Sequence, residues 1–433
     1  YLAIRADRVG DDTTFARILN MVEEAQDKKA KAQKFLEKLS RWYTPTIILL
    51  SVVFFFITSD TRLALTLLVI SCPGALVIST PVSIVAGIGN GAKHGVLIKG
   101  GEIMEKLGNV RAVAFDKTGT LTKGRPGVTR VKSYKTDGNE LLRIAAIGES
   151  YSEHPLGKAI IAEAKKKLGA VVPPPENPRM IIGQGLAFFW KGKEYYIGSR
   201  KLFASEGIDI SEHEKYLDSE EEKGQTAVIV GTSEGVYGII SIADTIRENA
   251  KMLVSDLRSQ GIKNVVMLTG DNRRAAKAVA DEVGLDVQYS ELLPKDKVRV
   301  LKELGEKYGT VAMVGDGVND APALASADLG IAIGGAGTDV AMETADVVLM
   351  SADIGKLSYV VGLSRATSHN IKQNIVFALI VVVLLLAGVL AKTMNMSLGM
   401  LVHEGSVLLV IINAMRLMGY GRSKDRNTAE RGI

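Results

Sequence analysis

Four long apolar stretches divide the 433-residue chain, and segments of mixed polarity separate them. The stretches are residues 43–58, 63–89, 371–391 and 397–415. At 1.5 Å per helical residue, the second and third are long enough to cross about 30 Å of hydrocarbon. The first is short and the fourth contains His403 and Glu404, so buried helices of a soluble protein are the alternative for these two. The pattern predicts four transmembrane helices.

The segment between the second and third apolar stretches alternates short apolar runs with helical patterns, which predicts a parallel sheet covered by helices. Residues 124–240 break this rhythm with a proline-rich turn, Pro173-Pro174-Pro175, and with strands of their own. We therefore predict an α/β domain into which a second, α+β domain is inserted. The predicted strands of the first domain are 110–115, 265–268, 311–314, 329–333 and 347–349, and those of the second are 188–196, 227–230 and 235–240.

Apolar residues recur at a period of 3.6 between residues 14 and 40, which predicts a helix leading into the first span. The net charge is +5, but aromatic residues make up only 6% and no basic stripe is interleaved with them, so the charge does not indicate a nucleic-acid partner. Lysine and arginine instead flank the spans, and the loops 59–62 and 392–396 are nearly bare of charge. This asymmetry predicts that both chain ends and the large middle segment are cytoplasmic.

Aspartates follow three of the predicted strands: Asp116, Asp271, and Asp316 with Asp320 nearby. Because the carboxyl ends of parallel strands meet at one edge of a sheet, we expect these side chains to lie close together. Mg²⁺ prefers a few carboxylates together with phosphate oxygens. The pattern predicts a magnesium and phosphate site, and the alternative is a set of solvated acidic loops.

An aspartate carboxylate can attack a phosphoryl group and form an aspartyl phosphate. Asp116 fits the nucleophile, because Thr118 and Gly119 supply backbone amides, and Thr118 a hydroxyl, for the phosphoryl oxygens. The other predicted members of this site are Thr269 and Lys297, which would neutralise phosphoryl charge, and Asp316, Asn319 and Asp320 at the magnesium end.

Four motifs occur in a fixed order: DKTGTLT at 116–122, TGDN at 269–272, LLPKDK at 292–297 and GDGVNDAPAL at 315–324. In these motifs the chain resembles the P-type ATPases, and the resemblance covers its whole length. The resemblance implies a phosphorylation domain of the haloacid-dehalogenase type with an inserted nucleotide domain, and it implies ATP and Mg²⁺ as ligands. It makes Asp116 the phosphorylated residue, and it gives catalytic roles to Lys117, Thr118, Thr269, Gly270, Asp271, Lys297 and Asn319, with Asp116, Thr118, Asp316 and Asp320 in the Mg²⁺ region.

The motif Ser152-Glu153-His154-Pro155-Leu156 resembles the SEHPL motif of the heavy-metal branch, whose histidine orients adenine. By the same resemblance, Glu149 contacts adenine, and Gly183 and Gly185 let the backbone approach the nucleotide. Without this resemblance, His154 would be interpreted as a residue at the start of a helix. A single Gly-x-Gly would be weak evidence for a nucleotide site. Ser199 departs from the asparagine usual in the family, so that contact is unsupported.

Cys72 and Pro73 lie in the middle of the second predicted span. Proline kinks a helix and frees carbonyls, and a thiol beside the kink can bind a soft or borderline cation. The alternative is an inert buried cysteine. His403 and Glu404 are ionisable residues within the fourth span, which are costly unless they have partners or a pathway role. One thiol, one imidazole and one carboxylate suit Zn²⁺ or Co²⁺.

The fourth span also resembles the last core helix of the cobalt-type metal ATPases, which carries a His-Glu-Gly motif. Three departures from the family concern the ion. Cys-Pro-Gly replaces Cys-Pro-Cys or Ser-Pro-Cys, Val382 stands where zinc, cadmium and lead exporters have lysine, and the features of copper pumps are missing. Copper(I) is therefore disfavoured and Co²⁺ or Zn²⁺ favoured, with Fe²⁺ and Ni²⁺ left open.

The resemblance predicts a division of the chain into eight parts. No Thr-Gly-Glu loop of an actuator domain occurs, which predicts a fragment of roughly the C-terminal two thirds of a pump. The parts are the end of the actuator domain (1–9), a cytoplasmic linker helix (10–42), two transmembrane helices (43–92), the first part of the phosphorylation domain (93–123), the nucleotide domain (124–240), the second part of the phosphorylation domain (241–360), two transmembrane helices (361–419) and a cytoplasmic tail (420–433).

The favoured function is ATP-driven export of a divalent transition-metal ion across the cell membrane by a monomeric pump, with ATP, the ion and the lipid bilayer as partners. One alternative is a membrane-tethered phosphatase of the haloacid-dehalogenase type, but such enzymes have Asp-x-Asp, whereas position 118 is threonine. A second alternative is a P-type pump for K⁺ or protons. A third is a non-enzymatic metal-binding subunit, which would require vestigial aspartates.

Overall fold

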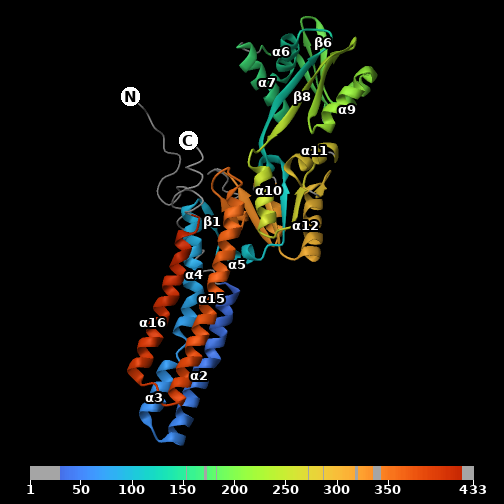
Figure 1. The fold of residues 1–433 in the computed structure, drawn as a ribbon. Coiled ribbons are helices and arrows are strands. Elements are labelled where there is room, and N and C mark those ends of the chain that lie inside the picture. The colour runs from blue at the N-terminus through green and yellow to red at the C-terminus, as the bar shows by residue number, and fades with distance from the viewer. Residues whose placement is uncertain are drawn as a thin grey trace, which may run out of the picture. The chain divides into compact units, whose positions relative to one another are not determined.

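The computed structural model describes residues 30–152, 154–169, 173–181, 183–271, 273–285, 287–316, 320–334 and 343–421. The chain forms two compact units (Figure 1). The first comprises Tyr1–Val113, Asp256–Asn264 and Val300–Ile433, and the second comprises Ala114–Ser255 and Val265–Arg299. The predicted end of the actuator domain, most of the linker helix, Asn319 and residues 422–433 of the tail lie outside the described residues.

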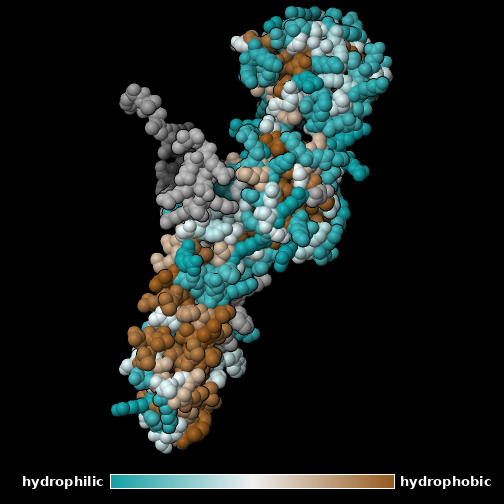
Figure 2. Space-filling model, in the orientation of Figure 1, coloured by the Kyte–Doolittle hydropathy of each residue, from teal (hydrophilic) through white to brown (hydrophobic). Residues whose placement is uncertain are grey.

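Long apolar helices make up much of the first unit. They are α2 (Lys31–Thr58), α3 (Thr61–Ile70), α4 (Gly74–Lys93), α15 (Lys356–Leu390) and α16 (Met396–Met415), which continues into the 3₁₀ turn η5 (Arg416–Gly419). They provide four segments long and apolar enough to cross a membrane: Ser40–Thr58, Thr61–Lys93, Lys356–Leu390 and Met396–Gly419. The four predicted spans are confirmed on length and composition. Exposed apolar side chains gather on the surface of these helices (Figure 2).

Two of these spans agree in detail with the sequence prediction. The helix predicted to lead into the first span runs into it without interruption, because α2 continues through residue 42 and contains Pro45. The hydroxyl of Thr46 donates to the carbonyl of Trp42 at 2.8 Å, one turn back along this stretch. In the second span the predicted kink is confirmed, since α3 ends at Ile70 and α4 begins only at Gly74.

A buried network of side-chain amides links three of the spanning helices. The hydroxyl of Ser83 in α4 donates to Oδ1 of Asn370 in α15 at 2.8 Å. Asn370 Nδ2 donates to the carbonyl of Asn413 in α16 at 2.9 Å. Asn413 Nδ2 in turn donates to Oδ1 of Asn374 at 2.8 Å. In a helix bundle that excludes water, such bonds fix the register of the helices, because an amide without a partner is costly there.

Four strands of the first unit are hydrogen-bonded in the order β1 (Val96–Ile98), β13 (Val347–Leu349), β12 (Leu329–Ile333) and β11 (Val311–Gly315). β12 is parallel to both β11 and β13, as predicted. β1, which the sequence did not predict, pairs antiparallel with β13 and makes an antiparallel edge. Helices α5 (Gly101–Gly108) and α13 (Ala321–Ser326) accompany these strands.

In strand β2 (Ala112–Asp116) the chain passes from the first unit to the second. Every residue of β2 is buried, which explains its unbroken apolar run. In the second unit, β9 (Asn264–Leu268) pairs in parallel with β10 (Val287–Tyr289). Helix α11 (Arg273–Val283) belongs to this unit, and the chain passes between the two units again within α10 (Ala250–Ser259) and α12 (Pro294–Tyr308).

The segment between β2 and β9 forms a separate antiparallel sheet in the second unit. Its six strands run in the order β3 (Thr122–Ser133), β8 (Gly235–Ile246), β7 (Thr226–Thr232), β6 (Lys193–Gly198), β5 (Gly185–Trp190) and β4 (Glu176–Ile181). The prediction of one strand over 188–196 was wrong. β5 and β6 form a hairpin, and its turn residues Lys191 and Gly192 have φ of 51° and 73°. A lysine-glycine pair adopts the same turn as Asn-Gly.

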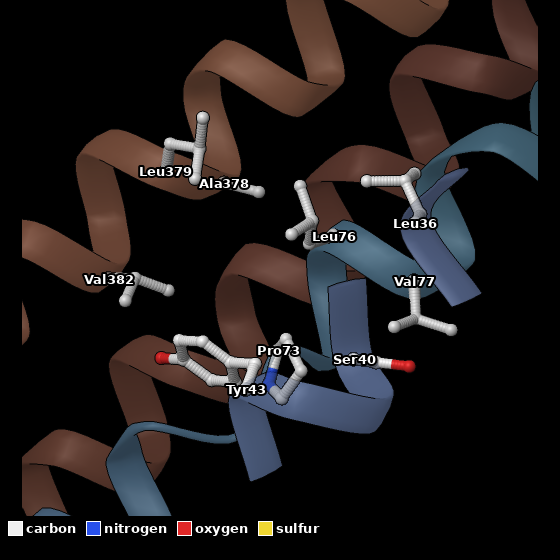
Figure 3. A pocket seen from close by; sticks show the side chains of 9 residues that line it. All are labelled: Leu36, Ser40, Tyr43, Pro73, Leu76, Val77, Ala378, Leu379 and Val382. Atoms are coloured by element: carbon white, nitrogen blue, oxygen red, sulfur yellow. The ribbon is translucent and has the colours of Figure 1, made fainter. Parts of the chain in front are cut away.

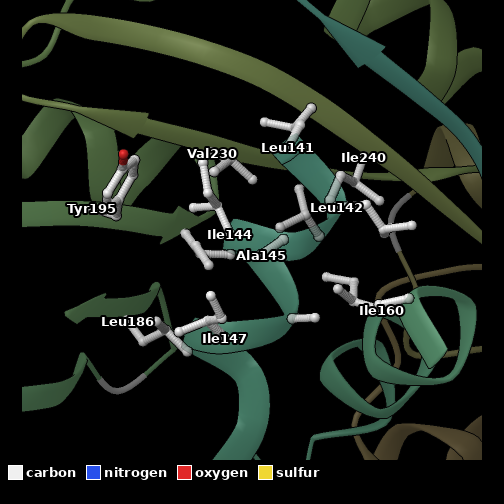
Figure 4. Packing of buried hydrophobic residues seen from close by; sticks show 14 of the residues in the cluster. Leu141, Leu142, Ile144, Ala145, Ile147, Ile160, Leu186, Tyr195, Val230 and Ile240 are labelled. Atoms are coloured by element: carbon white, nitrogen blue, oxygen red, sulfur yellow. The ribbon is translucent and has the colours of Figure 1, made fainter. Parts of the chain in front are cut away.

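Alternate residues of this sheet pack against helices on opposite faces, as the period of two requires. Phe188, Tyr195 and Ile197 belong to a core with α6 (Gly138–Gly148) and α7 (Pro155–Leu168) (Figure 4). Ala187 and Tyr196 belong to a second core with α8 (Arg200–Ser205) and α9 (Glu214–Glu222). The sheet is therefore buried on both faces and gives a stiff support to the loops at its edges.

Candidate phosphorylation site and ion path

The loop after β2 begins with the predicted nucleophile. Asp116 is the last residue of a buried strand and is itself only 6% exposed. Thr118 is extended and Gly119 has φ of +76°, so the chain turns sharply directly after Lys117. A side chain at Gly124 would put its Cβ 3.0 Å from the Cα of Gly119. The two glycines of DKTGTLTKG therefore permit a tight loop in which the backbone crosses close to itself.

Two ion pairs surround this loop within the second unit. Nζ of Lys297 lies 2.6 Å from Oδ1 of Asp116, and both side chains are largely buried. The ammonium group of Lys117 pairs with the carboxylate of Asp271. Thr269 is 2% exposed, and its hydroxyl accepts from the backbone amide of Asp271 at 3.1 Å. The structure thus brings together five of the predicted residues at the ends of β2 and β9.

The position of Lys297 follows from local backbone structure. It lies in the first turn of α12, and its amide donates to the carbonyl of Leu293 at 3.1 Å. The amide of Leu292 donates to the carbonyl of Thr269 at 3.1 Å, which ties the LLPKDK segment to the end of β9. Gly270 lies in this same turn, where a Cβ would come 3.3 Å from the carbonyl of Leu292.

Two residues that shape the loop were missed by the sequence analysis. Arg247 donates to the carbonyls of Gly119 and Thr120, each at 2.8 Å. Asp244 accepts from the hydroxyl of Thr122 and from the amide of Gly124, the latter at 3.1 Å. Both follow the apolar part of β8, in the run Ala243-Asp244-Thr245-Ile246-Arg247. An aspartate and an arginine at the end of a buried strand were the available signal.

The remaining predicted magnesium residues belong to the first unit. Asp316 follows β11 and is partly exposed. Asp320 is 2% exposed, and a Cβ on Gly315 would lie 3.0 Å from its Oδ2, so its carboxylate is folded against the end of β11. These carboxylates and that of Asp116 are the hard oxygen donors that Mg²⁺ prefers, so the donor chemistry fits the ion. Among the described residues, no three His, Cys, Asp or Glu side chains converge to hold a metal ion.

Two of the predicted nucleotide residues, Glu149 and His154, lie near each other at one end of α6 and α7. Nδ1 of His154 accepts from the amide of Leu156 at 3.3 Å, so this histidine caps the start of α7. Glu149 ends α6, and a Cβ on Gly157 would lie 2.4 Å from its Oε2. Burial raises the pKa of Glu149, and the hydroxyl of Ser152 and the charge of His154 partly offset this rise.

Gly183 and Gly185 have different surroundings. Gly183 has φ of +73° with no atom near its Cβ position, so it is an open turn residue. Gly185 has φ of +148°, and a Cβ there would lie 2.1 Å from the carbonyl of Ile197 on β6. The hydroxyl of Ser199, which departs from the family pattern, is buried and has no hydrogen-bond partner among the described residues. Gly185 is therefore required by strand packing, whatever it does for a nucleotide.

The membrane residues gather around the break between α3 and α4. Cys72 lies in the break and its side chain is exposed. A Cβ on Gly74 would lie 3.4 Å from Nε2 of His403, so the buried imidazole rests against the start of α4. Its ring nitrogens have no hydrogen-bond partner within the described part of the chain. The side chain of Glu404 is exposed. As stated above, Cys72, His403 and Glu404 do not form a three-ligand site in this structure.

An apolar cavity of about 140 Å³ lies beside the same break, between α2, α4 and α15 (Figure 3). Pro73 and Val382 both line it, so the position that departs from the lysine of related exporters faces the kink. The phenol oxygen of Tyr43, at the edge of this cavity, is buried without a hydrogen-bond partner among the described residues. The other lining residues are Leu36, Ser40, Leu76, Val77, Ala378 and Leu379.

Comparison with known proteins agrees with this geometry. The sequence pattern of the haloacid dehalogenase-like hydrolases matches residues 110–328, about half of the chain. A crystal structure of a zinc-transporting PIB-type ATPase in the E2.Pi state superposes with a TM-score of 0.79 and 39% sequence identity, covering 94% of this chain and 68% of that one. The chain belongs to the heavy-metal P-type ATPases.

Curated relatives extend the family comparison. A probable cadmium-transporting ATPase of Staphylococcus aureus (strain MRSA252) is 43% identical over 98% of this chain. The manganese-exporting P-type ATPase of Mycobacterium tuberculosis (strain ATCC 25618 / H37Rv) is 40% identical over 96% of it. The chain spans about 60% of the length of these relatives. Family membership confirms the resemblance and the predicted fold class, while the limits of the eight parts and the role of each site residue stay predictions.

Proposed function

We propose that this chain is the phosphorylated, nucleotide-binding and ion-conducting part of an ATP-driven exporter of a divalent transition-metal ion. The observation that carries the proposal is the buried contact of 2.6 Å between Lys297 and Asp116 in a chain of this family. A buried ammonium group beside a carboxylate keeps that carboxylate ionised, as a nucleophile must be. The same ammonium group can then balance phosphoryl charge when ATP is bound.

In the proposed reaction, a carboxylate oxygen of Asp116 attacks the γ-phosphorus of ATP. A new O–P bond forms as the bond between the γ-phosphorus and the β–γ bridging oxygen breaks, and ADP leaves with that electron pair. Lys297 and the hydroxyl of Thr269 compensate the charge on the γ-phosphoryl oxygens. The pair of Lys117 and Asp271 holds the rim of the loop in place. Water later hydrolyses the aspartyl phosphate and releases inorganic phosphate.

Asp116, Asp316 and Asp320, with oxygens of the Thr118 residue, are the groups that would hold Mg²⁺ in this proposal. When bound, the ion would neutralise the repulsion between carboxylate and phosphate. Thr118 stands where phosphatases of this superfamily carry a second aspartate. A threonine hydroxyl is a poor general acid or base near neutral pH, so we expect a long-lived phosphoenzyme, which suits a pump better than a phosphatase.

The transported ion, as the cargo of the pump, would pass the break between α3 and α4. Cys72, His403 and Glu404 are the proposed ligands, since a thiolate, an imidazole and a carboxylate suit borderline divalent ions. We favour Zn²⁺ or Co²⁺. The names of the related ATPases, which mention cadmium, manganese and zinc, support a divalent ion of this class. The charge flanking the spans supports a cell-membrane protein with its α/β domains in the cytoplasm.

The test is phosphoenzyme formation from γ-labelled ATP in membranes that contain the full-length protein, with a panel of Zn²⁺, Co²⁺, Cd²⁺, Mn²⁺ and Cu⁺. We expect stimulation by one or more of the divalent ions, and weak or no stimulation by Cu⁺. Cys72→Ser should remove the stimulation but leave phosphorylation by inorganic phosphate in the reverse direction. Labelling that is equally strong without metal, or too short-lived to trap, would favour the tethered phosphatase instead.

A further inference from the structure

A cleft of about 530 Å³ opens between α15 and the turn that follows α16, within the first unit. On α15 its lining residues are spaced three and four apart, so they form one face of the helix. The turn contributes the other wall. The lining residues are Ala366, His369, Asn370, Gln373, Arg416, Leu417, Gly419 and Tyr420.

The wall formed by the turn is held rigidly. Nδ2 of Asn90 in α4 donates to the carbonyls of Leu417 at 2.8 Å and Tyr420 at 3.0 Å. On the α15 side, Asn370 is fixed by the buried amide network described above. Nη1 of Arg416 donates to Oδ1 of Asn413 at 3.1 Å, which orients the guanidinium group. The backbone of the turn and the side chain of Asn370 are thus fixed by the helix bundle, while the side chains of His369, Gln373 and Arg416 are exposed at the cleft.

Three side chains bring unused hydrogen-bonding groups to this cleft. Apart from the bond to Asn413, the guanidinium of Arg416 has no partner in the described ranges, and neither do the side chains of His369 and Gln373. No carboxylate lines the cleft, and Glu404 is the only acidic residue between positions 361 and 421. An arginine with free donors and no carboxylate nearby attracts an anion and repels a divalent cation.

The cleft lies at one end of the apolar surface of the bundle. Val376 and Met415, which are 55% and 54% exposed, are among the last exposed apolar residues on α15 and α16 before it. His369 precedes Val376 by two helical turns, or about 10 Å. The polar headgroup layer on each side of a bilayer is about 5 to 8 Å thick. From this spacing we place Arg416 and Gln373 at the depth of lipid phosphate, next to the start of the exposed apolar helix surface.

We propose that this cleft binds the phosphate group of an anionic phospholipid. Arg416 donates charge-assisted hydrogen bonds to the phosphate oxygens, and Gln373 and His369 complete the contact. The acyl chains lie along the exposed apolar surface of α15 and α16. Basic clefts between spanning helices at this depth are a general way of binding anionic headgroups. The site is separate from the phosphorylation loop and does not depend on the proposed pump activity.

The test uses native mass spectrometry of the detergent-purified full-length protein with added phosphatidylglycerol or phosphatidylcholine. We expect one retained phosphatidylglycerol, and we expect Arg416→Gln to weaken it about tenfold through loss of the charged hydrogen bonds. The matched control is Lys372→Gln, which removes the same charge from an exposed position on α15 that does not line the cleft. This control should change binding by less than about twofold.

A millimolar excess of inorganic phosphate distinguishes the two sources of a phosphate group. The lipid proposal requires that the bound phosphatidylglycerol remain, because its acyl chains add binding energy that the free ion lacks. Displacement by phosphate would overturn the lipid assignment, as would equal retention of phosphatidylcholine or equal losses in Arg416→Gln and Lys372→Gln. Arg416→Lys serves as a folded reference, which should bind between the wild type and Arg416→Gln.

Discussion

The loop after β2 and the end of α6 and α7 both carry motifs of the family, but their residues are used differently. In the loop, the charged side chains pair with one another, as Asp116 does with Lys297 and Lys117 with Asp271. At the proposed nucleotide site, by contrast, the motif residues support the fold. His154 caps α7, and Gly185 lets β5 approach β6. A buried cluster of opposite charges adds little to the stability of a fold, because removing the charges from water is costly. A helix cap and a glycine at a close backbone contact both stabilise the fold.

This difference indicates how strongly each motif supports a chemical role for its residues. The charge cluster at Asp116 needs a chemical explanation, because apolar residues would stabilise the sheet edge at least as well. The residues at the proposed nucleotide site would be explained by folding even if no nucleotide bound there. Substitutions can separate the two situations, since one set should change the reaction and the other the stability of the inserted sheet.

The largest effect is expected from Asp116→Asn. Because an amide cannot form the acyl phosphate, phosphoenzyme formation from ATP should fall by about a thousandfold or more. The measurement is acid-stable label from γ-labelled ATP in membranes with the full-length protein. Asp281→Asn, at a surface pair with Lys277 on α11, is the control and should label normally. Residual labelling of the Asp116 variant would show that another residue is the nucleophile.

Lys297→Met should lower the rate of phosphorylation by about a hundredfold, the usual consequence of removing one group that balances transition-state charge. Lys297→Arg should recover part of the rate, because it keeps the charge beside Asp116 with a different shape. The quantity to measure is the single-turnover rate of phosphorylation at saturating ATP. If both variants were equally slow, lost packing rather than lost charge would be the cause.

Substitutions of Gly183 and Gly185 test the proposed nucleotide site directly. Gly185→Ala forces a Cβ to within 2.1 Å of a backbone carbonyl, so we expect the opening free energy of the β5–β6 hairpin to fall by about 3 kcal/mol. Gly183→Ala meets no atom and should cost about 1 kcal/mol, for the positive φ alone. Hydrogen exchange of the hairpin amides measures both. A nucleotide role predicts that Gly183→Ala weakens ATP binding more than its small stability loss explains.

The smallest effect concerns the pH dependence of stability at Glu149. Since burial raises the pKa of this carboxyl, the folded protein binds the proton more tightly than the unfolded chain. Stability should therefore fall as pH rises from the ordinary glutamate pKa, about 4.5, through the raised value. Glu149→Gln should remove this pH dependence, which we expect to change the free energy of unfolding by less than about 1 kcal/mol. Exchange of the α6 amides between mildly acidic and neutral pH would show it, and an unchanged profile would contradict it.

Much of the architecture was predictable from the sequence, because apolar runs and their periods depend only on neighbouring residues. The four spans, the kink at Pro73 and the strands β2, β9, β11, β12 and β13 were found in this way. The hairpin of β5 and β6 was missed because Lys191-Gly192 is a less familiar turn signal than Asn-Gly. The short strands β1 and β10, of three residues each, were also not predicted.

The residues of the candidate site also fall into those that local sequence predicts and those that it does not. Motif order identified Asp116, Lys297 and Asp271 before any coordinates, because each motif is contiguous. Arg247 and Asp244 were not found, since their task is to hold carbonyls and amides of a loop more than a hundred residues away in the chain. Such contacts depend on which strand ends the fold brings together, and no local pattern records them.

The amide network of Ser83, Asn370, Asn374 and Asn413 limits how the bundle can move. Sliding α4 past α15 or α16 would strand several amides in a region without water, so these three helices behave as one block near the network. Among the described residues, no side-chain hydrogen bond of this kind is made by residues 71–73, between α3 and α4. If the outer half of the second span rocks, we expect the bend to fall at residues 71–73, where the helix is interrupted.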